Sequence, residues 1–350
     1  MKIIGIGVVA FFLVVIQMLF YKKYWSKNLY VSVRFCQDAI YEGDEGQIVE
    51  VIENRKRLPL PMLKVKFQTS KNLGFYDEKG SKTTDQYYRN DIFQVGGGEK
   101  ITRTLAFRGN KRGYYRINNI DMVGSDLFFL NEDSRNQTMN QYMYVYPSIY
   151  QKDDLRLSLQ KLNGEIIVKR HMLEDPFEYR GIREYQPFDD IRSVNWKATA
   201  RTGELKVNQK NYTAMQTIRI FLNLEDESIW KKDKEIEKSM QMAMGIAAFF
   251  LAQGIRVSCY ANGKDILTDE PVEIQGLSGM AQLDVLGKAF ARLDTTKAPH
   301  KFVSLYREKV LAEADGFFTF FISPNDYDDF KALLEECDAQ GMDYHWYHVE

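Results

Sequence analysis

The first apolar segment of the chain predicts a membrane anchor. Residues 3–20 are almost continuously apolar, and at about 1.5 Å per residue a helix of this length nearly matches the roughly 30 Å hydrocarbon core of a bilayer. Aromatic and basic residues follow at 21–27, where interfacial anchors are expected. No small-residue cleavage site follows the apolar run, so we predict an uncleaved helix over residues 1–27 rather than a signal peptide.

Apolar and polar residues then alternate through residues 28–150. The alternation is clearest in Leu29–Phe35, Gly46–Ile52, Met62–Phe67 and Ile101–Phe107, and shorter runs follow at 114–117, 120–123 and 142–146. About seven short strands separated by glycine-rich turns are typical of an immunoglobulin-like β-sandwich. The polar run 68–94 lacks this alternation, so we expect an extended loop there.

The period changes again in residues 151–350, where strand and helix patterns alternate. We predict strands at 217–224, 255–261, 317–322 and 344–349, a turn at Asn262–Gly263, and helices at 232–253, 279–293 and 326–340. Alternating strands and helices favour a mainly parallel sheet that is covered by helices on both faces. This part of the chain is therefore expected to be an α/β domain.

A charged stretch at 175–209 leads into the α/β domain. Pro187 followed by Asp189 and Asp190 is typical of a helix start, and Gly203 suits a position just past the helix end. Between them, apolar residues recur at helical spacing at Ile191, Val194 and Ala198. The stretch mixes arginines with aspartates and glutamates, and charges of both signs favour local pairing over a positive field for nucleic acid.

Composition narrows the class of protein further. The 350 residues carry a formal net charge of −1 and three cysteines without metal-like spacing. The balanced charge gives no indication of a nucleic-acid partner, and the odd, scattered cysteines favour a reducing compartment. Lysines after the apolar run outnumber Lys2 before it, so the positive-inside tendency predicts a single-pass cell-membrane protein with a cytoplasmic carboxy-terminal part.

The stretch also carries an ordered motif of glycine, arginine, aromatic and acidic residues. Its members are Gly181, Arg183, Tyr185, Pro187, Asp189, Arg192, Trp196, Ala200 and Arg201. This motif resembles the signature of the bacterial proteins grouped as domain of unknown function 58. Phe188, Asn195 and Thr199 depart from the pattern, which usually has glycine, aspartate and serine there. The Asn195 departure removes a carboxylate from the motif.

The resemblance implies a von Willebrand factor A-like fold for the α/β domain. Metal-binding domains of that type carry Asp-x-Ser-x-Ser after the first strand, whose oxygens hold Mg²⁺. The equivalent positions here are Asn223, Glu225 and Glu227, without a hydroxyl in either serine position. Asp226 and Ser228 could form a site only through a shift in register. We therefore expect a degenerate site, with no metal and no cofactor.

The leading hypothesis is a non-enzymatic, membrane-anchored adaptor. The resemblance implies a MoxR-type AAA+ ATPase as partner, and a transglutaminase-like membrane protein as a further one, in assembly or cell-envelope processes. The residues expected to matter are Arg180, Gly181, Arg183, Tyr185, Pro187, Asp189, Asp190, Arg192, Trp196 and Arg201. The arginines either pair with nearby acids and lock the domain entry, which we favour, or bind a partner.

Two other classes of function remain open. Asp189 and Asp190 are neighbouring carboxylates, and paired carboxylates perform hydrolysis in some enzymes. However, no nucleophile, phosphate-binding glycine loop or metal set accompanies them, so catalytic residues are not expected. The second alternative is an outward-facing, metal-dependent adhesion module. It requires the inverted membrane orientation and a working metal site. The sequence names neither the partner nor the oligomeric state.

Overall fold

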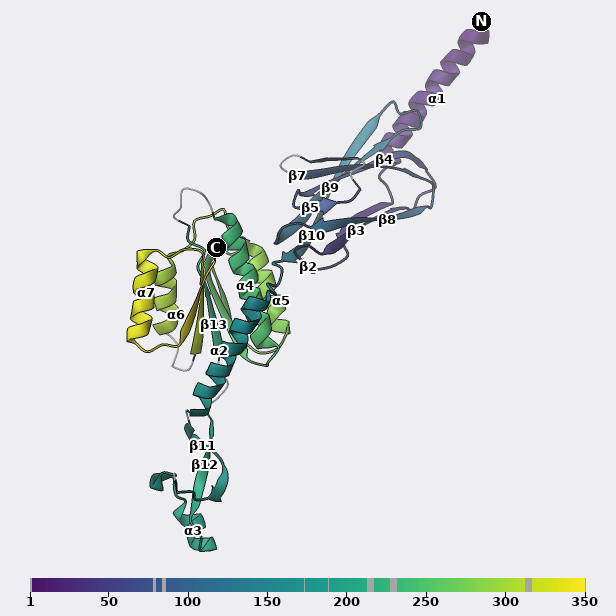
Figure 1. Ribbon diagram of the computed structural model, residues 1–350. Coiled ribbons are helices and arrows are strands. Elements are labelled where there is room, and N and C mark those ends of the chain that lie inside the picture. Colours follow the sequence, from purple (N-terminus) through teal and green to yellow (C-terminus); the bar gives the residue numbers. More distant parts are fainter. Residues whose placement is uncertain are drawn as a thin grey trace. The chain divides into compact units, whose positions relative to one another are not determined.

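The computed structural model describes residues 2–349, with gaps at 78–79, 84–85, 173, 188, 213–216, 227–231 and 312–316; side chains at 165–180 and 209–212 are also outside the described part. The chain divides into two compact units. One contains residues 1–148 and 287–293, and the other contains residues 149–286 and 294–350. Both units are visible in Figure 1.

The first unit begins with helix α1 (Lys2–Tyr24), which is followed by a two-sheet sandwich. The smaller sheet has the order β1 (Leu29–Phe35), β3 (Glu45–Asn54), β8 (Lys100–Gly109) and β5 (Leu73–Phe75). The larger sheet has the order β2 (Ala39–Tyr41), β10 (Glu132–Tyr146), β9 (Gly113–Ser125), β4 (Leu60–Ser70), β7 (Gln86–Val95) and β6 (Ser81–Thr83). The predicted apolar helix and β-sandwich are therefore both present.

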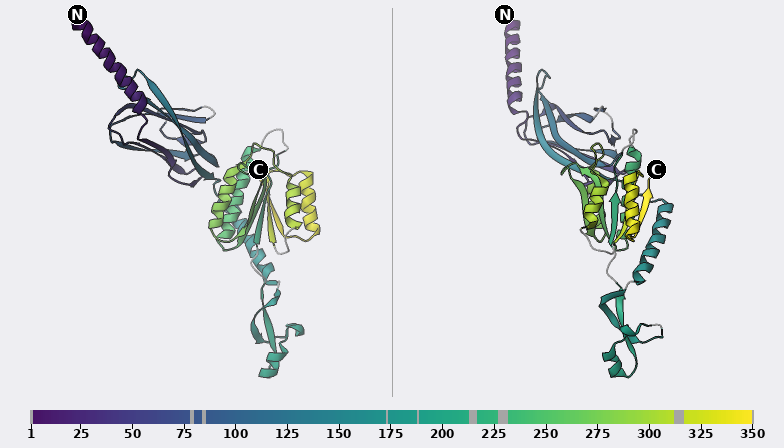
Figure 2. Two further views of the ribbon diagram at one scale, coloured as in Figure 1. Left: turned by 180° about the vertical axis from the view of Figure 1, so that it is seen from behind. Right: turned by 90° about the vertical axis from the view of Figure 1, so that its left-hand side faces the viewer.

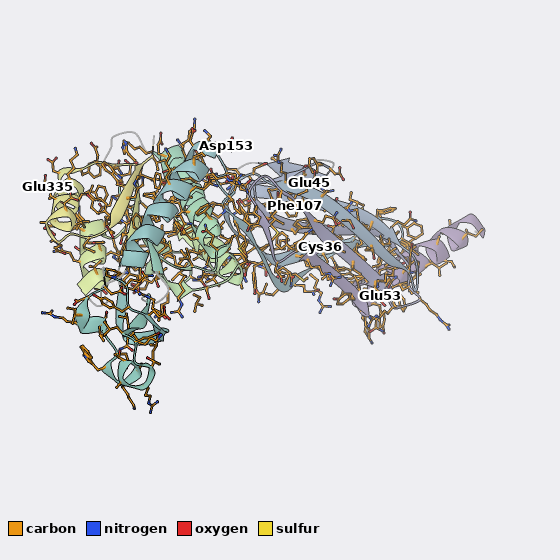
Figure 3. The ribbon with its side chains drawn as sticks, turned by 60° about the horizontal axis from the view of Figure 1, so that its bottom comes forward. Cys36, Glu45, Glu53, Phe107, Asp153 and Glu335 are labelled. Atoms are coloured by element: carbon orange, nitrogen blue, oxygen red, sulfur yellow. The ribbon has the colours of Figure 1, made fainter. Side chains whose placement is uncertain are left out.

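Period-two alternation builds the sandwich core. In β1, Val31 and Val33 are fully buried while the residues between them face outward. Phe107, labelled in Figure 3, is buried in the same cluster and packs edge-on against Phe35. Removal of this alternating apolar surface from water is the main stabilising contribution to such a two-layer fold, at roughly 25 cal/mol per Å².

The loop expected at 68–94 is wrong, because most of this run is strand. β4 continues to Ser70, β5 and β6 follow, and β7 pairs with β4 in an antiparallel ladder from Ser70↔Gln86 to Leu60↔Val95. β7 does alternate between buried and exposed positions. Two of its inward positions, however, are Arg89 and Asp91 rather than apolar residues. Because part of its inward face is charged, the hydrophobic pattern did not indicate this strand.

The buried charges of β7 form a paired cluster. The Arg89 guanidinium donates to Asp91 at 2.6 Å and to the Asp77 carboxylate at 3.0 Å. Arg103 pairs with Asp91 and also with Glu50, at 2.7 Å. Burial raises the pKa of the Glu50 carboxyl to about 7, against the opposite influence of Arg103. Each buried charge in the cluster thus has a partner of opposite sign, which its burial requires.

The second unit contains a mainly parallel sheet. Its strand order is β15 (Pro271–Leu277), β14 (Arg256–Asp265), β13 (Thr217–Leu222), β17 (Phe317–Ser323) and β18 (Tyr344–His348), with β16 (Leu293–Asp294) paired to β14. The pairs β13–β14, β13–β17 and β17–β18 are parallel, and β14–β15 is antiparallel. The predicted alternation of strands and helices therefore gives an α/β arrangement.

Helices cover both faces of this sheet, as Figure 2 shows. The unit contains α2 (Asp153–Met172), α4 (Asp233–Leu251), α6 (Phe302–Leu311), α7 (Asp328–Ala339) and the first half of α5 (Ala281–Arg292), up to Leu286. On the α4 side, Phe250 packs against Phe320. On the other side, Phe321 packs against Tyr306 of α6 and Phe330 of α7. Neighbouring residues of β17 thus point to opposite faces, which explains its unbroken apolar run.

The turn expected at Asn262–Gly263 is wrong. β14 continues to Asp265, and its ladder with β15 shifts register between Ala261 and Lys264. The chain reverses after Asp265 instead, and the Asp265 carboxylate accepts the Leu267 N–H at 2.7 Å there. An Asn-Gly pair also suits a β-bulge, and here it lies within such an irregularity of the ladder.

Candidate interaction surface

Residues 174–212 form a small hairpin module. Strands β11 (Glu174–Glu184) and β12 (Lys206–Tyr212) pair with each other in a two-stranded antiparallel sheet. Between them lie a 3₁₀ turn, η1 (Ile191–Ser193), and a short helix, α3 (Trp196–Thr202). This hairpin module contains nearly all of the charged stretch that the sequence singled out.

The continuous helix expected after Pro187 is wrong, because Asn195 divides it. The Asn195 side chain accepts the Ala198 N–H at 2.9 Å and so begins α3 as its N-cap. The Asp190 carboxylate accepts the Arg192 N–H at 3.0 Å and caps η1. Gly203 has φ 75° and ends α3, as its position in the sequence predicted.

Arg183 and Asp189 lock the loop that follows β11. The two Arg183 amino groups donate to the two Asp189 oxygens at 2.6 Å each, and the Gln186 N–H donates to Asp189 at 2.8 Å. The Arg183 hydrogen bonds, with that of Gln186, hold the pKa of the Asp189 carboxyl below its usual value. The expected internal pairing is therefore present for Arg183.

The remaining cations of the module differ from Arg183 in their exposure and pairing. Arg192, Lys197 and Arg201 are all exposed. Within the described ranges, none of these three has an ion-pair partner. Lys206 instead lies 3.3 Å from Glu184 and 3.2 Å from Glu204. The acids of the stretch thus neutralise Arg183 and Lys206, and leave a group of cations facing solvent.

Large apolar side chains are exposed on the same module. Ile191 is 67% exposed, although it belongs to the predicted helical pattern, and Trp196 is 63% exposed. Neither η1 nor α3 contains a buried residue. Other exposed apolar residues are Ile182 and Leu205. Tryptophan and arginine are enriched among the residues that contribute most to protein–protein binding. The module therefore has the surface composition of a binding site, with exposed tryptophan, isoleucine and arginine side chains.

The other residues that the sequence singled out in this stretch make fewer contacts that define a role. Tyr185 is half-buried and its N–H donates to the Leu205 carbonyl at 3.0 Å. Pro187 is exposed. A Cβ on Gly181 would meet no atom within 4 Å, so packing within the chain does not require glycine there. Phe188 and the side chain of Arg180 lie outside the described residues.

The degenerate metal positions lie at the carboxyl end of β13. Asn223 is buried, and its carbonyl oxygen accepts the Glu225 N–H at 3.0 Å and the Asn262 amide at 3.2 Å. Its own amide donates to the Ser323 hydroxyl at 3.2 Å. Glu227 lies outside the described residues. The Asn223 side chain therefore links three neighbouring strand ends through hydrogen bonds.

Glu225 also has a structural role at this edge. Its carboxylate accepts the Phe302 N–H at 3.0 Å, at the start of α6, and its backbone carbonyl accepts from the Asn325 amide. Sequence analysis missed the contributions of Asn262, Ser323 and Asn325. Polar residues directly after the predicted strands 255–261 and 317–322 were the available signal, since carboxyl ends of parallel strands meet at one edge.

Comparison with solved structures found only distant similarities. A cohesin from the archaeon Archaeoglobus fulgidus is 12% identical, with 37% of this chain and 96% of that chain covered and a TM-score of 0.24. A CARDB domain from Pyrococcus furiosus is 16% identical, with 33% and 89% covered and a TM-score of 0.22. The sporulation control protein Spo0M from Bacillus subtilis is 11% identical, with 45% and 58% covered and a TM-score of 0.18.

These TM-scores are too low to support an argument about fold or function, so the architecture rests on the strand pairing described above. A search of curated proteins found none that matches. A family model, by contrast, matches residues 181–275, which run from the hairpin module through β13, α4 and β14 to β15. This match assigns residues 181–275 to the family described as "Protein of unknown function DUF58".

Proposed function

We propose that the chain is a non-enzymatic, membrane-anchored adaptor that binds a protein partner through its hairpin module. The observation that carries this proposal is the exposure of Trp196 and Ile191 beside the free cations Arg192 and Arg201. Aromatic residues and arginine are enriched at interface centres because they bury large areas and make several hydrogen bonds. The Arg183–Asp189 pair holds the loop in shape before binding, which lowers the entropy cost of association.

The geometry favours an adaptor over a carboxylate hydrolase. A general acid needs a raised pKa, whereas Arg183 lowers the pKa of Asp189. Asp190 caps η1 through the Arg192 N–H. Both carboxylates therefore have structural roles in the hairpin module, and neither has the environment that acid catalysis requires.

We also propose a fold for the second unit and a partner for the protein. A von Willebrand factor A-like fold for the second unit is supported by its parallel sheet with helices on both faces. The Asn223 amide network supports a metal-independent version of that fold. From the resemblance of the signature, the partner is a MoxR-type AAA+ ATPase, with a transglutaminase-like membrane protein as a further candidate. The length and apolar composition of α1 support a single-pass anchor, and the lysines that follow it support a cytoplasmic position of the large part.

The test is a quantitative pull-down of the intact protein from detergent-solubilised native membranes. Trp196→Ala and Arg201→Glu should each lower recovery of the ATPase at least severalfold, because they remove an exposed anchor and a free cation. Matched controls at exposed positions of the sandwich are Tyr142→Ala and Lys100→Glu, which should retain the partner. Undiminished recovery with both module variants would exclude the module as the contact. Hydrolytic activity abolished by Asp190→Asn would support the enzyme alternative instead.

A further inference from the structure

The turn between β9 and β10 exposes four consecutive large apolar residues. Leu127, Phe128, Phe129 and Leu130 are between 47% and 59% exposed. Single exposed apolar residues are ordinary on protein surfaces, but a contiguous group indicates a surface that is covered by a partner or by lipid. The module on which the adaptor proposal rests belongs to the other unit, so this apolar turn requires its own explanation.

The apolar turn is held in place by hydrogen bonds from its backbone to Asp126. The buried Asp126 carboxylate accepts the N–H groups of Phe128 and Leu130, both at 3.0 Å. The Phe129 N–H donates to the Asp126 carbonyl at 3.2 Å. Three of the four apolar residues thus have satisfied backbone donors inside the turn. This arrangement suits a hydrocarbon environment, where an unsatisfied N–H is costly.

The backbone conformation of the apolar turn is also strained. Phe129 has φ 58°, in the left-handed region that bulky residues rarely occupy. Such strain of about 1–3 kcal/mol persists where the surrounding structure imposes it, and it concentrates at functional sites. The turn therefore presents its apolar side chains in spite of local strain.

The apolar turn lies beside the carboxyl-terminal end of α1. Met18, Tyr21 and Lys22 of α1 line a narrow cleft with Asp126 and Asn131, the residues that flank the turn. The views in Figures 1 and 2 agree that the tip of the β9–β10 hairpin lies alongside α1 and points toward the amino terminus. The apolar turn is therefore level with the last apolar turns of the anchor.

Tight packing fixes this arrangement within the first unit. Trp25 is buried against Gly124, where an added Cβ would fall 2.3 Å from the Trp25 ring. The Tyr21 hydroxyl donates to the Pro59 carbonyl at 3.0 Å, in the turn between β3 and β4. That turn carries the exposed Arg57, Arg55, which pairs with Glu53, and the half-buried Lys56, which donates to Asn54, and α1 ends in Lys22 and Lys23. Cations at this end of the sandwich match anionic lipid headgroups.

We propose that Leu127–Leu130 insert into the same bilayer leaflet as the carboxyl-terminal end of α1. The sandwich then contacts the membrane at two points, the anchor helix and the apolar turn, with the basic β3–β4 turn at headgroup level. The proposal rests on membrane anchoring by α1, as proposed above. Lipid is favoured over a protein occupant because the turn continues the apolar surface of α1 and satisfies its own backbone donors.

The test measures the depth of spin labels in the intact chain, reconstituted in nanodiscs that contain phosphatidylglycerol. Cys36 is the exposed cysteine, so Cys36→Ser provides the background, while Cys259 and Cys337 are buried. Labels are placed at Phe128→Cys in the apolar turn, at Val9→Cys in α1, and at Tyr142→Cys on the exposed surface of β10. Collision with apolar oxygen is compared with collision with a water-soluble nickel complex.

The label at residue 128 should favour oxygen over nickel severalfold, as the label at residue 9 does, and the label at residue 142 should favour nickel. A label at Leu130 provides a second reading if the Phe128→Cys chain does not fold. Nickel preference at 128 and 130, with oxygen preference at 9, would overturn lipid insertion and leave anchoring intact. Protection from both reagents would overturn it in favour of a second copy of the chain. Nickel preference at 9 would overturn anchoring itself.

Discussion

At the scale of single residues, the charged side chains serve two different purposes. Arg183 and Arg89 each hold a carboxylate through short hydrogen bonds. Arg192 and Arg201 remain open to solvent, and among the described residues nothing pairs with them. The sequence showed that acids and bases were close in number and position, but the assignment of partners depends on how the loop folds. The motif could therefore be predicted, whereas its division into locking and exposed arginines could not.

The lock predicts that Arg183→Glu loosens the hairpin module. The variant places two like charges where the wild-type pair meets, so amides of residues 186–203 should exchange hydrogen severalfold faster. Because the pKa of Asp189 is lowered in the folded chain, the stability that the pair contributes is present above the ordinary carboxyl range and is lost as pH falls through the folded pKa. The double variant Arg183→Glu with Asp189→Arg should restore protection in part. Unchanged exchange in Arg183→Glu would contradict the lock.

Arg89 provides a stability prediction for the sandwich. Its side chain is fully buried, and Arg89→Met would leave Asp91 with Arg103 as its only remaining cation among the described partners. Breaking a buried pair costs about 3–5 kcal/mol, and we expect the lower end of this range because Arg103 remains. Chemical denaturation measures the loss. The matched exposed variant Arg307→Met, which breaks a pair with Glu336, should cost less than about 1 kcal/mol.

At the scale of elements, predictability followed the clarity of the repeating pattern. β1 and β13 were located closely because their inward residues are apolar. β7 was missed because its inward residues include Arg89 and Asp91. α2 was missed because its described buried side chains, Leu155 and Leu159, make up a very narrow apolar stripe. Pattern reasoning detects apolar faces, and elements that bury charge or little surface escape it.

The break between η1 and α3 yields a prediction for Asn195. Asn195→Ala removes the cap from α3 and should lower local stability by about 1 kcal/mol. Asn195→Asp restores the residue usual in the family signature and keeps an acceptor for the Ala198 N–H. The Asn195 amide donates to the Asn208 side-chain oxygen at 2.6 Å, and in the aspartate variant a half-turn of the Asn208 amide restores this hydrogen bond with the direction reversed. The variant should therefore match the wild type, because a carboxylate suits a helix start. Hydrogen exchange at residues 196–202 measures both. Equal exchange in the alanine variant would show that the cap is unimportant.

At the scale of the whole molecule, membrane orientation separates the adaptor from the adhesion alternative. Cys36, labelled in Figure 3, is exposed on the sandwich, whereas Cys259 and Cys337 are buried, and burial raises the pKa of both thiols. A membrane-impermeant thiol reagent should therefore leave intact cells unlabelled and label Cys36 in inverted vesicles. The Cys36→Ser chain should lose this signal. Labelling of Cys36 in intact cells would mean an outward sandwich.

The order of the large parts was readable from the sequence because each has its own period of apolar residues. A continuous apolar run predicts α1. Alternating apolar and polar residues predict the sandwich, and alternating strand and helix patterns predict the α/β unit. The exposed surfaces were not readable in this way. Ile191 has the spacing of a buried helical face with Val194 and Ala198, yet it is 67% exposed, and neither η1 nor α3 contains a buried residue.

The packing of Tyr21 and Trp25 has a mechanical consequence. α1 ends at Tyr24 and β1 begins at Leu29, and both aromatic side chains are buried against the sandwich, so no free linker separates helix from domain. A transmembrane helix changes its tilt when bilayer thickness changes. A rigidly joined sandwich must rotate with that tilt. In the membrane-anchored state that we propose, the helix acts as a lever rather than a tether, and makes the orientation of the domain sensitive to membrane thickness.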